Sequence, residues 1–98
     1  MADHFSQLRD MLITFPSVVE RQNEFGTKHA YFYRNREFAH FHSENQMDIK
    51  IPRNEIEQIA PDAIENPFSA QWILFNINSE DDAKRAFLLL QKAYRKVA

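Results

Sequence analysis

The sequence predicts a two-layer α+β protein in which an antiparallel sheet of about five strands is covered on one face by two terminal helices. Three observations predict this class. Apolar residues recur at three- and four-residue spacing near both ends of the chain, which is typical of amphipathic helices. Between these ends, short segments rich in β-branched and aromatic residues alternate with polar turns. Because such turns are too short for parallel crossover connections, we expect an antiparallel meander.

The N-terminal helix is expected over residues 3–15. Asp3 can cap its first turn, and Pro16 prevents the helix from continuing. Its apolar positions recur at helical spacing: Phe5, Leu8, Leu12 and Phe15. A first strand is expected over residues 17–25, where the β-branched pair Val18-Val19 favours extended backbone.

Three more strands are expected over residues 28–34, 37–42 and 47–51, because short polar segments separate them. Pro52 ends this meander, since proline cannot donate a backbone hydrogen bond to a ladder. A short helix is then expected over residues 53–60.

The chain is expected to close with a connection, a strand and a long helix. Pro61 and Pro67 interrupt the connection, and residues 71–77 form the most apolar strand candidate. Ser79 can cap the final helix, whose first turn is acidic, as the helix dipole favours. The predicted order is α-β-β-β-β-α-β-α, with residues 1–98 forming a single domain.

Composition excludes several functional classes. A chain of 98 residues with 44% hydrophobic and 13% aromatic residues can bury a self-standing core. A single glycine excludes glycine-rich phosphate loops, and the absence of cysteine excludes disulfides, thiolate zinc sites and cysteine nucleophiles. The net charge of −2 argues against a nucleic-acid partner. Without a signal-peptide pattern or a membrane-spanning segment, we expect a cytoplasmic protein with no membrane association.

The strand register decides which side chains share each face of the sheet. If Asn35-Arg36 forms a two-residue turn, Tyr31 pairs with His40. The next connection can have three or four residues, and we prefer three because His40 then pairs with Asp48 and polar side chains separate from apolar ones. The face toward the helices is then expected to carry Ala30, Phe32, Ala39, Phe41, Met47, Ile49 and Ile51.

The opposite face is expected to combine aromatic, histidine and charged side chains. Its expected members are His29, Tyr31, Tyr33, Phe38, His40, His42, Asp48 and Lys50, joined by Trp72, Leu74 and Asn76. The candidate ligand-binding residues among them are Tyr31, Tyr33, Phe38, Lys50 and Trp72. The structural alternative is that residues 61–69 cover part of this face and that Lys50 only forms a surface pair with Asp48.

His40 and His42 are separated by one residue, so a strand projects both imidazoles to the same side, about 6–7 Å apart. Such a pair can hold a metal ion with Asp48 as a third ligand. It can also act in acid–base catalysis, with Asp48 tuning a histidine. The alternative is ordinary cross-strand contact. These three residues are the candidate catalytic and metal-binding residues, and the sequence specifies neither a reaction nor a cofactor.

Residues 36–52 also carry a motif. The segment Arg36-Glu37-Phe38-Ala39-His40-Phe41-His42 is followed, after a polar turn, by Met47-Asp48-Ile49-Lys50-Ile51-Pro52. This pattern resembles the luciferase-domain family of small bacterial and fungal proteins, and the resemblance extends from about Gly26 to Tyr94. It implies that His40, His42 and Asp48 are the residues of interest. A later histidine of the family is replaced here by the loop Asn66-Pro67-Phe68, and we do not transfer a luciferase activity to this chain.

Together these patterns predict a small cytoplasmic protein that binds a small organic ligand or a metal on an aromatic and histidine-bearing sheet face. The alternative is an interaction module without catalytic activity, in which the same face forms a homodimer or docks a partner protein.

Overall fold

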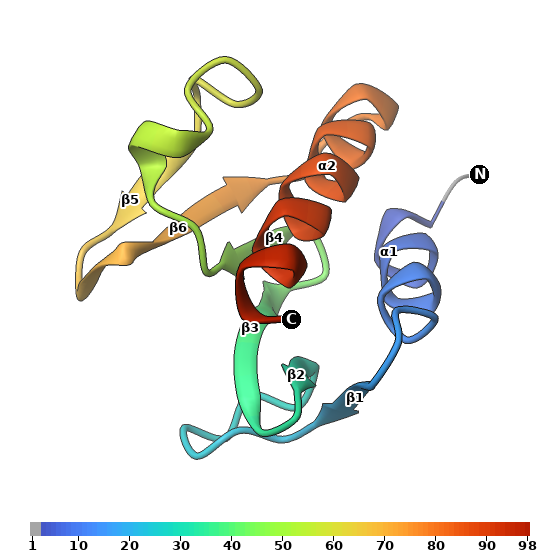
Figure 1. Cartoon of the computed structure of the whole chain (residues 1–98). Helices are drawn as coiled ribbons and strands as arrows, with labels where there is room; N and C mark the ends of the chain where they lie inside the picture. The colour runs from blue at the N-terminus through green and yellow to red at the C-terminus, as the bar shows by residue number, and fades with distance from the viewer. Residues whose placement is uncertain (1–2) are drawn as a thin grey trace.

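The computed structural model describes residues 3–98 and confirms the α+β class (Figure 1). Met1 and Ala2, which the predicted domain includes, lie outside the described residues. The elements in chain order are α1 (His4–Leu12), β1 (Val18–Arg21), β2 (Ala30–Tyr33), β3 (Arg36–Ser43), β4 (Gln46–Ile49), the 3₁₀ turn η1 (Arg53–Glu55), β5 (Ile64–Asn66), β6 (Ser69–Asn76) and α2 (Glu80–Val97). Within residues 3–98, six strands form one antiparallel sheet in the order β1-β2-β3-β4-β6-β5, one strand more than expected.

Both long helices begin where the sequence predicts. The Asp3 carboxylate accepts a hydrogen bond from the Ser6 N–H at 3.2 Å, and the Ser79 hydroxyl accepts one from the Asp82 N–H at 3.1 Å. These bonds satisfy N–H groups that have no partner within the first helical turn. None of the helices in residues 3–98 has the length and apolar character needed to cross a membrane.

The two helices cover one face of the sheet, which we call the helix side, and leave the other as the open side (Figure 1). The ring of Phe5 in α1 lies 4.6 Å from that of Phe41 in β3. The ring of Tyr94 in α2 lies 5.7 Å from that of Tyr33 in β2. The core lies between these layers, and its fully buried members include Leu12, Met47, Ile49, Ile73, Phe75, Leu89 and Leu90.

The segment between β4 and β6 differs from the prediction. The short helix expected over residues 53–60 begins at the predicted residue but is shorter, because only Arg53–Glu55 form a 3₁₀ turn and Pro61 follows soon after. The connection expected around Pro61 and Pro67 contains β5, an edge strand hydrogen-bonded to β6. The two prolines flank this strand and therefore do not remove any of its ladder donors.

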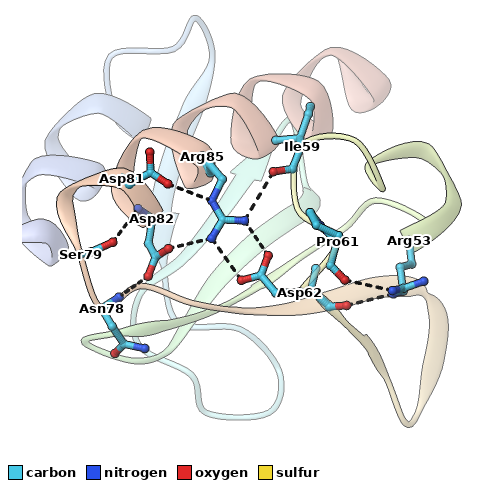
Figure 2. Close-up of polar contacts among 10 residues, drawn as sticks. Arg53, Ile59, Pro61, Asp62, Asn78, Ser79, Asp81, Asp82 and Arg85 are labelled. Carbon is cyan, nitrogen blue, oxygen red and sulfur yellow. Dashed lines mark hydrogen bonds and ion pairs between the residues drawn. The ribbon is translucent and has the colours of Figure 1, made fainter.

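Arg85 of α2 anchors the chain that leads into β5 (Figure 2). Its guanidinium donates hydrogen bonds to Asp62 at 3.1 Å and to Asp82 at 2.7 Å, and these bonds raise the pKa of Arg85. Arg53 donates two more hydrogen bonds to carbonyl groups within residues 61–63. The chain that enters β5 is therefore held against both α2 and η1.

The hairpin between β2 and β3 turns one residue earlier than predicted. Its central residues are Arg34 and Asn35, with φ angles of 47° and 74°, and positive φ at both positions is what a type I′ turn requires. The earlier turn alone shifts the register by about two residues, which would pair Tyr31 with Phe38 and leave the faces as predicted. Tyr31 pairs with Ala39 instead, and not with His40 as predicted, because β3 contains an extra residue. This extra residue exchanges the two faces of β2.

The face assignments in β2 were therefore wrong. Tyr31 and Tyr33 lie on the helix side, where Tyr31 is fully buried and its ring lies 6.1 Å from that of Phe41. Ala30 and Phe32, which were expected to face the helices, lie on the open side. There the Phe32 ring is covered by the guanidinium of Arg21, 3.9 Å from the ring centroid.

A bulge at Phe38 changes the faces of β3. Glu37 pairs with Phe32 and His40 pairs with Ala30, so Phe38 is an extra residue in the strand. Since Ala30 and Phe32 share the open side, Glu37 and His40 share it too, although regular alternation would separate them. Phe38 was predicted on this side, but it is fully buried and its ring lies 5.9 Å from that of Tyr94 on the helix side.

The register between β3 and β4 confirms the preferred prediction. His40 pairs with Asp48, and Phe41 pairs with Met47. The connection differs in detail, because Ser43 also pairs with Gln46 and His42 is left as the extra residue of a second bulge.

Candidate functional site

The open side of the sheet carries a cleft of about 440 Å³, which we call the open-face cleft. Its walls come from the β1–β2 loop, the middle of β3 and β4, and the β5–β6 hairpin. The lining residues are Asn23, Phe25, Thr27, Glu37, His40, Asp48, Asn66, Phe68, Ser69 and Trp72. Three segments far apart in the sequence therefore meet at this one site.

His40 lies between two carboxylates at the base of the cleft. Its Nε2 lies 2.6 Å from Asp48 Oδ2, and its Nδ1 lies 3.1 Å from Glu37 Oε2. The side chains of His40 and Glu37 are each 18% exposed, and that of Asp48 is 5% exposed. Burial lowers the pKa of His40, but the hydrogen bonds to Asp48 and Glu37 outweigh it and raise this pKa to about 9. At neutral pH the imidazolium is therefore hydrogen-bonded to Glu37 through Nδ1 and ion-paired with Asp48 through Nε2.

Asn23 connects Glu37 to the tip of the β1–β2 loop. Its Nδ2 donates to Glu37 Oε2 at 2.9 Å. Its Oδ1 accepts hydrogen bonds from the N–H groups of Phe25 at 3.0 Å and Thr27 at 2.9 Å. The first of these bonds defines an Asx turn, so the position of Phe25 depends on the asparagine that binds the cleft carboxylate.

Asn66 repeats this arrangement on the other side of the cleft. Its Nδ2 donates to Asp48 Oδ1 at 3.1 Å, and its Oδ1 accepts a hydrogen bond from the Phe68 N–H at 2.8 Å. A continuous chain of hydrogen bonds and one ion pair thus links two phenylalanine-bearing turns through one imidazole. We call its five side chains the His40 relay: Asn23, Glu37, His40, Asp48 and Asn66.

Three aromatic side chains surround the relay. The Trp72 ring lies 5.5 Å from the His40 ring, with an interplanar angle of 40°. Phe25 is 83% exposed and Phe68 is 95% exposed, although the backbone N–H group of each is bound in an Asx turn. Large apolar side chains gathered at a cleft mark a contact surface more often than scattered ones do.

The structure brings together part of the predicted site. His40, His42 and Asp48 lie side by side, since His42 Nδ1 is 3.7 Å from Asp48 Oδ2 and its side chain is 64% exposed. Trp72 lies with them. Lys50 does not: it lines a separate hollow near the C-terminal end of α2.

The ligand-binding prediction also included three residues that lie on the helix side, Tyr31, Tyr33 and Phe38. The bulge at Phe38 removes them from the face that carries His40. Their expected place beside the histidines was therefore wrong.

The geometry of His40 favours proton donation over metal binding. Both of its ring nitrogens face carboxylate oxygens, and an imidazolium has no lone pair with which to bind a metal. Across residues 3–98, no group of three His, Cys, Asp or Glu side chains is arranged to hold a metal ion. Metal binding by His40, His42 and Asp48 remains a prediction from the sequence alone.

Sequence reasoning missed seven residues of the cleft: Asn23, Phe25, Thr27, Glu37, Asn66, Phe68 and Ser69. A signal for four of them exists, because Asn23-Glu24-Phe25-Gly26 and Asn66-Pro67-Phe68-Ser69 share the pattern Asn-x-Phe followed by a small residue. Asparagine at the first position of such a segment favours an Asx turn. The repeat therefore predicts two similar turns.

None of the family models, curated proteins and solved structures compared with this chain matches it. The functional interpretation consequently rests on the geometry of the open-face cleft.

Proposed function

We propose that this chain is a small binding module that takes a small organic ligand into the open-face cleft. One observation carries the proposal: the backbone N–H groups of two almost fully exposed phenylalanines, Phe25 and Phe68, are bound by the relay that forms the base of the cleft. Because the backbone at both residues is held beside the cleft, less conformational freedom is lost when their rings bind a ligand.

The composition of the cleft supports the same proposal. Ligand sites in proteins combine mainly apolar and aromatic walls with a few polar groups that orient the ligand. Here Trp72 and the two phenylalanines supply the walls, and Glu37 and His40 supply the polar groups. A volume of about 440 Å³ lies within the range of small-molecule sites, which is about 300–1,000 Å³.

Trp72 provides the experiment, because it is the only tryptophan in the sequence and lies in the cleft. We expect small aromatic and heterocyclic fragments to change its fluorescence and to raise the melting temperature of the protein. Phe68→Ala should weaken this binding about tenfold, whereas Phe87→Ala, which removes an exposed ring from α2, should not. A fragment collection that leaves both signals unchanged would contradict the proposed function.

A protein-interaction or homodimerisation module is the second candidate, and the exposure of Phe25 and Phe68 favours it as well. Light scattering during size-exclusion chromatography tests the homodimer directly. We expect a dimer to dissociate on Phe68→Ala substitution, while a chain that stays monomeric at millimolar concentration argues against a dimer.

We also propose a relationship to the luciferase-domain family and a cytoplasmic location. The family proposal is supported by the proximity of His40, His42 and Asp48, the three residues that the motif contributes. If it is correct, the structure of a family member should show the strand order β1-β2-β3-β4-β6-β5 with its own histidines on the open side. A different strand order would refute the relationship.

A further inference from the structure

We infer that the ligand of the open-face cleft is an organic cation, in which an ammonium group is attached to an apolar body. This inference rests on the proposed function, since it names the class of ligand for the same cleft.

The charge of the cleft favours a cation. Its lining includes two carboxylates, one imidazole and no lysine or arginine. With both carboxylates ionised and His40 protonated, the net charge of the lining is −1. A cationic ligand neutralises this charge inside a partly desolvated site, whereas an anionic ligand is repelled by it.

Glu37 has an oxygen that can receive such a group. Both of the hydrogen bonds that its side chain makes within residues 3–98, from Asn23 and from His40, end on Oε2. Oε1 therefore keeps its capacity to accept a proton donor or to face a quaternary ammonium. Asp48 differs, because Asn66 binds its Oδ1 and His40 faces its Oδ2. Glu37 is accordingly the expected partner of the ligand.

The aromatic walls favour the same ligand class independently of the charge. A cation is attracted to the face of an aromatic ring, most strongly to that of tryptophan. Trp72, Phe25 and Phe68 line the cleft around the carboxylates, so one ligand can contact a ring and a carboxylate together. A neutral aromatic ligand can pack against the aromatic walls but does not neutralise the charge of −1.

The experiment compares three probes that share a benzyl group and differ in charge: benzyltrimethylammonium, benzyl alcohol and phenylacetate. Trp72 fluorescence reports binding of each probe to the full chain. We expect benzyltrimethylammonium to bind at least tenfold more tightly than benzyl alcohol, and phenylacetate to bind most weakly. The affinity of the cation should also fall as salt is added, because salt screens the attraction.

Two variants identify the charge responsible. Glu37→Gln keeps a hydrogen-bonding side chain. It should lower the affinity for benzyltrimethylammonium about tenfold and leave the affinity for benzyl alcohol unchanged. Glu57→Gln is the matched control, because Glu57 is exposed and lies outside the cleft, and it should change neither affinity. If Glu37→Gln fails to fold, the salt dependence of the wild-type chain still decides the result.

Equal binding of the cation and the alcohol, or binding that salt does not weaken, would overturn this inference and leave the proposed function intact. If none of the three probes and no fragment binds, both are overturned.

Discussion

The Glu20 cluster and the His40 relay both join a histidine to a carboxylate, but α1 covers the first and no helix covers the second. We define the Glu20 cluster as Glu20, Arg9, His29 and Tyr31. The Glu20 carboxylate accepts hydrogen bonds from Arg9 at 2.8 and 3.0 Å and from the Tyr31 hydroxyl at 2.6 Å, and His29 Nδ1 lies 3.3 Å from it. Because Arg9 belongs to α1, this cluster ties the first helix to the edge of the sheet.

The two clusters differ in whether their carboxylate oxygens can accept further hydrogen bonds. Both oxygens of Glu20 are occupied. Burial raises the pKa of Glu20, but the hydrogen bonds from Arg9, Tyr31 and His29 lower it to about 2. In the His40 relay, Glu37 keeps one oxygen open beside exposed aromatic rings. A cluster whose carboxylate oxygens all have partners stabilises the fold. A cluster with an available carboxylate oxygen at a cleft can also bind a ligand.

The largest expected effect comes from Glu20→Ala. Arg9, His29 and the buried Tyr31 hydroxyl would all lose their partner, so we expect a loss of about 3 kcal/mol in the free energy of unfolding. For a domain of 98 residues this corresponds to a fall of about 12 °C or more in melting temperature. Thermal unfolding followed by circular dichroism measures it, with the exposed Glu24→Ala as the control. A loss below about 1 kcal/mol would show that α1 does not depend on the cluster.

The two clusters should affect the pH dependence of the free energy of unfolding in different ranges, the Glu20 cluster at acidic pH and the His40 relay at alkaline pH. The pKa of Glu20 is lowered from 4.5 to about 2, so its contribution is present above pH 4.5 and is lost as the pH falls toward 2. The pKa of His40 is raised from 6.5 to about 9, so its contribution is present below pH 6.5 and is lost as the pH rises toward 9. Each contribution is on the order of 2–3 kcal/mol.

Urea unfolding between pH 2 and 10 measures both changes. Glu20→Gln should flatten only the acidic limb of the stability curve, and His40→Gln should flatten only the alkaline limb. If one substitution flattens both limbs, the two clusters are coupled and cannot be treated as separate regions.

A smaller effect is expected from Asn66→Ala. This substitution removes the hydrogen bond to Asp48 and the Asx turn at Phe68, which we expect to cost about 1 kcal/mol. It should also weaken probe binding severalfold, because the backbone that carries the Phe68 ring is no longer bound to the side chain of residue 66. Asn78→Ala is a suitable control, since Asn78 uses its backbone N–H to bind Asp82. Unchanged probe binding would show that the turn at Phe68 is held by other contacts.

The smallest effect on stability is expected from Phe25→Ala. Its ring is 83% exposed, so the free energy of unfolding should change by less than about 0.5 kcal/mol. Probe affinity should nevertheless fall about tenfold, measured through Trp72 fluorescence. A large loss of stability would place Phe25 with the Glu20 cluster as a structural residue and would contradict its assignment to the cleft.

The fold was predictable because most of its determinants are local. Asp3 and Ser79 cap their helices as expected, and the pairing of His40 with Asp48 follows from separating polar and apolar side chains. The strand β5 was not predictable in this way, because its three residues lie between two prolines and show no alternation. Its pairing with β6 comes from the hairpin and from the anchoring by Arg85 and Arg53.

The candidate site was only partly predictable, because one local feature changed the faces of two neighbouring strands. The bulge at Phe38 placed Tyr31 on the helix side and Glu37 on the open side. A bulge does not alter the pattern of apolar and polar residues enough to be detected by alternation. The contact between Glu37 and His40 could therefore not be derived from their spacing.

The bulge at Phe38 has an evolutionary consequence. Glu37 and His40 are three residues apart, and they share the open side because the strand holds one extra residue between them. In a regular strand a single intervening residue places two side chains on the same side, so loss of the extra residue would leave Glu37 and His40 together, whereas insertion of one more residue would turn Glu37 toward the helices and divide the relay. Descendants of this chain can therefore shorten this part of the strand by one residue more safely than they can lengthen it.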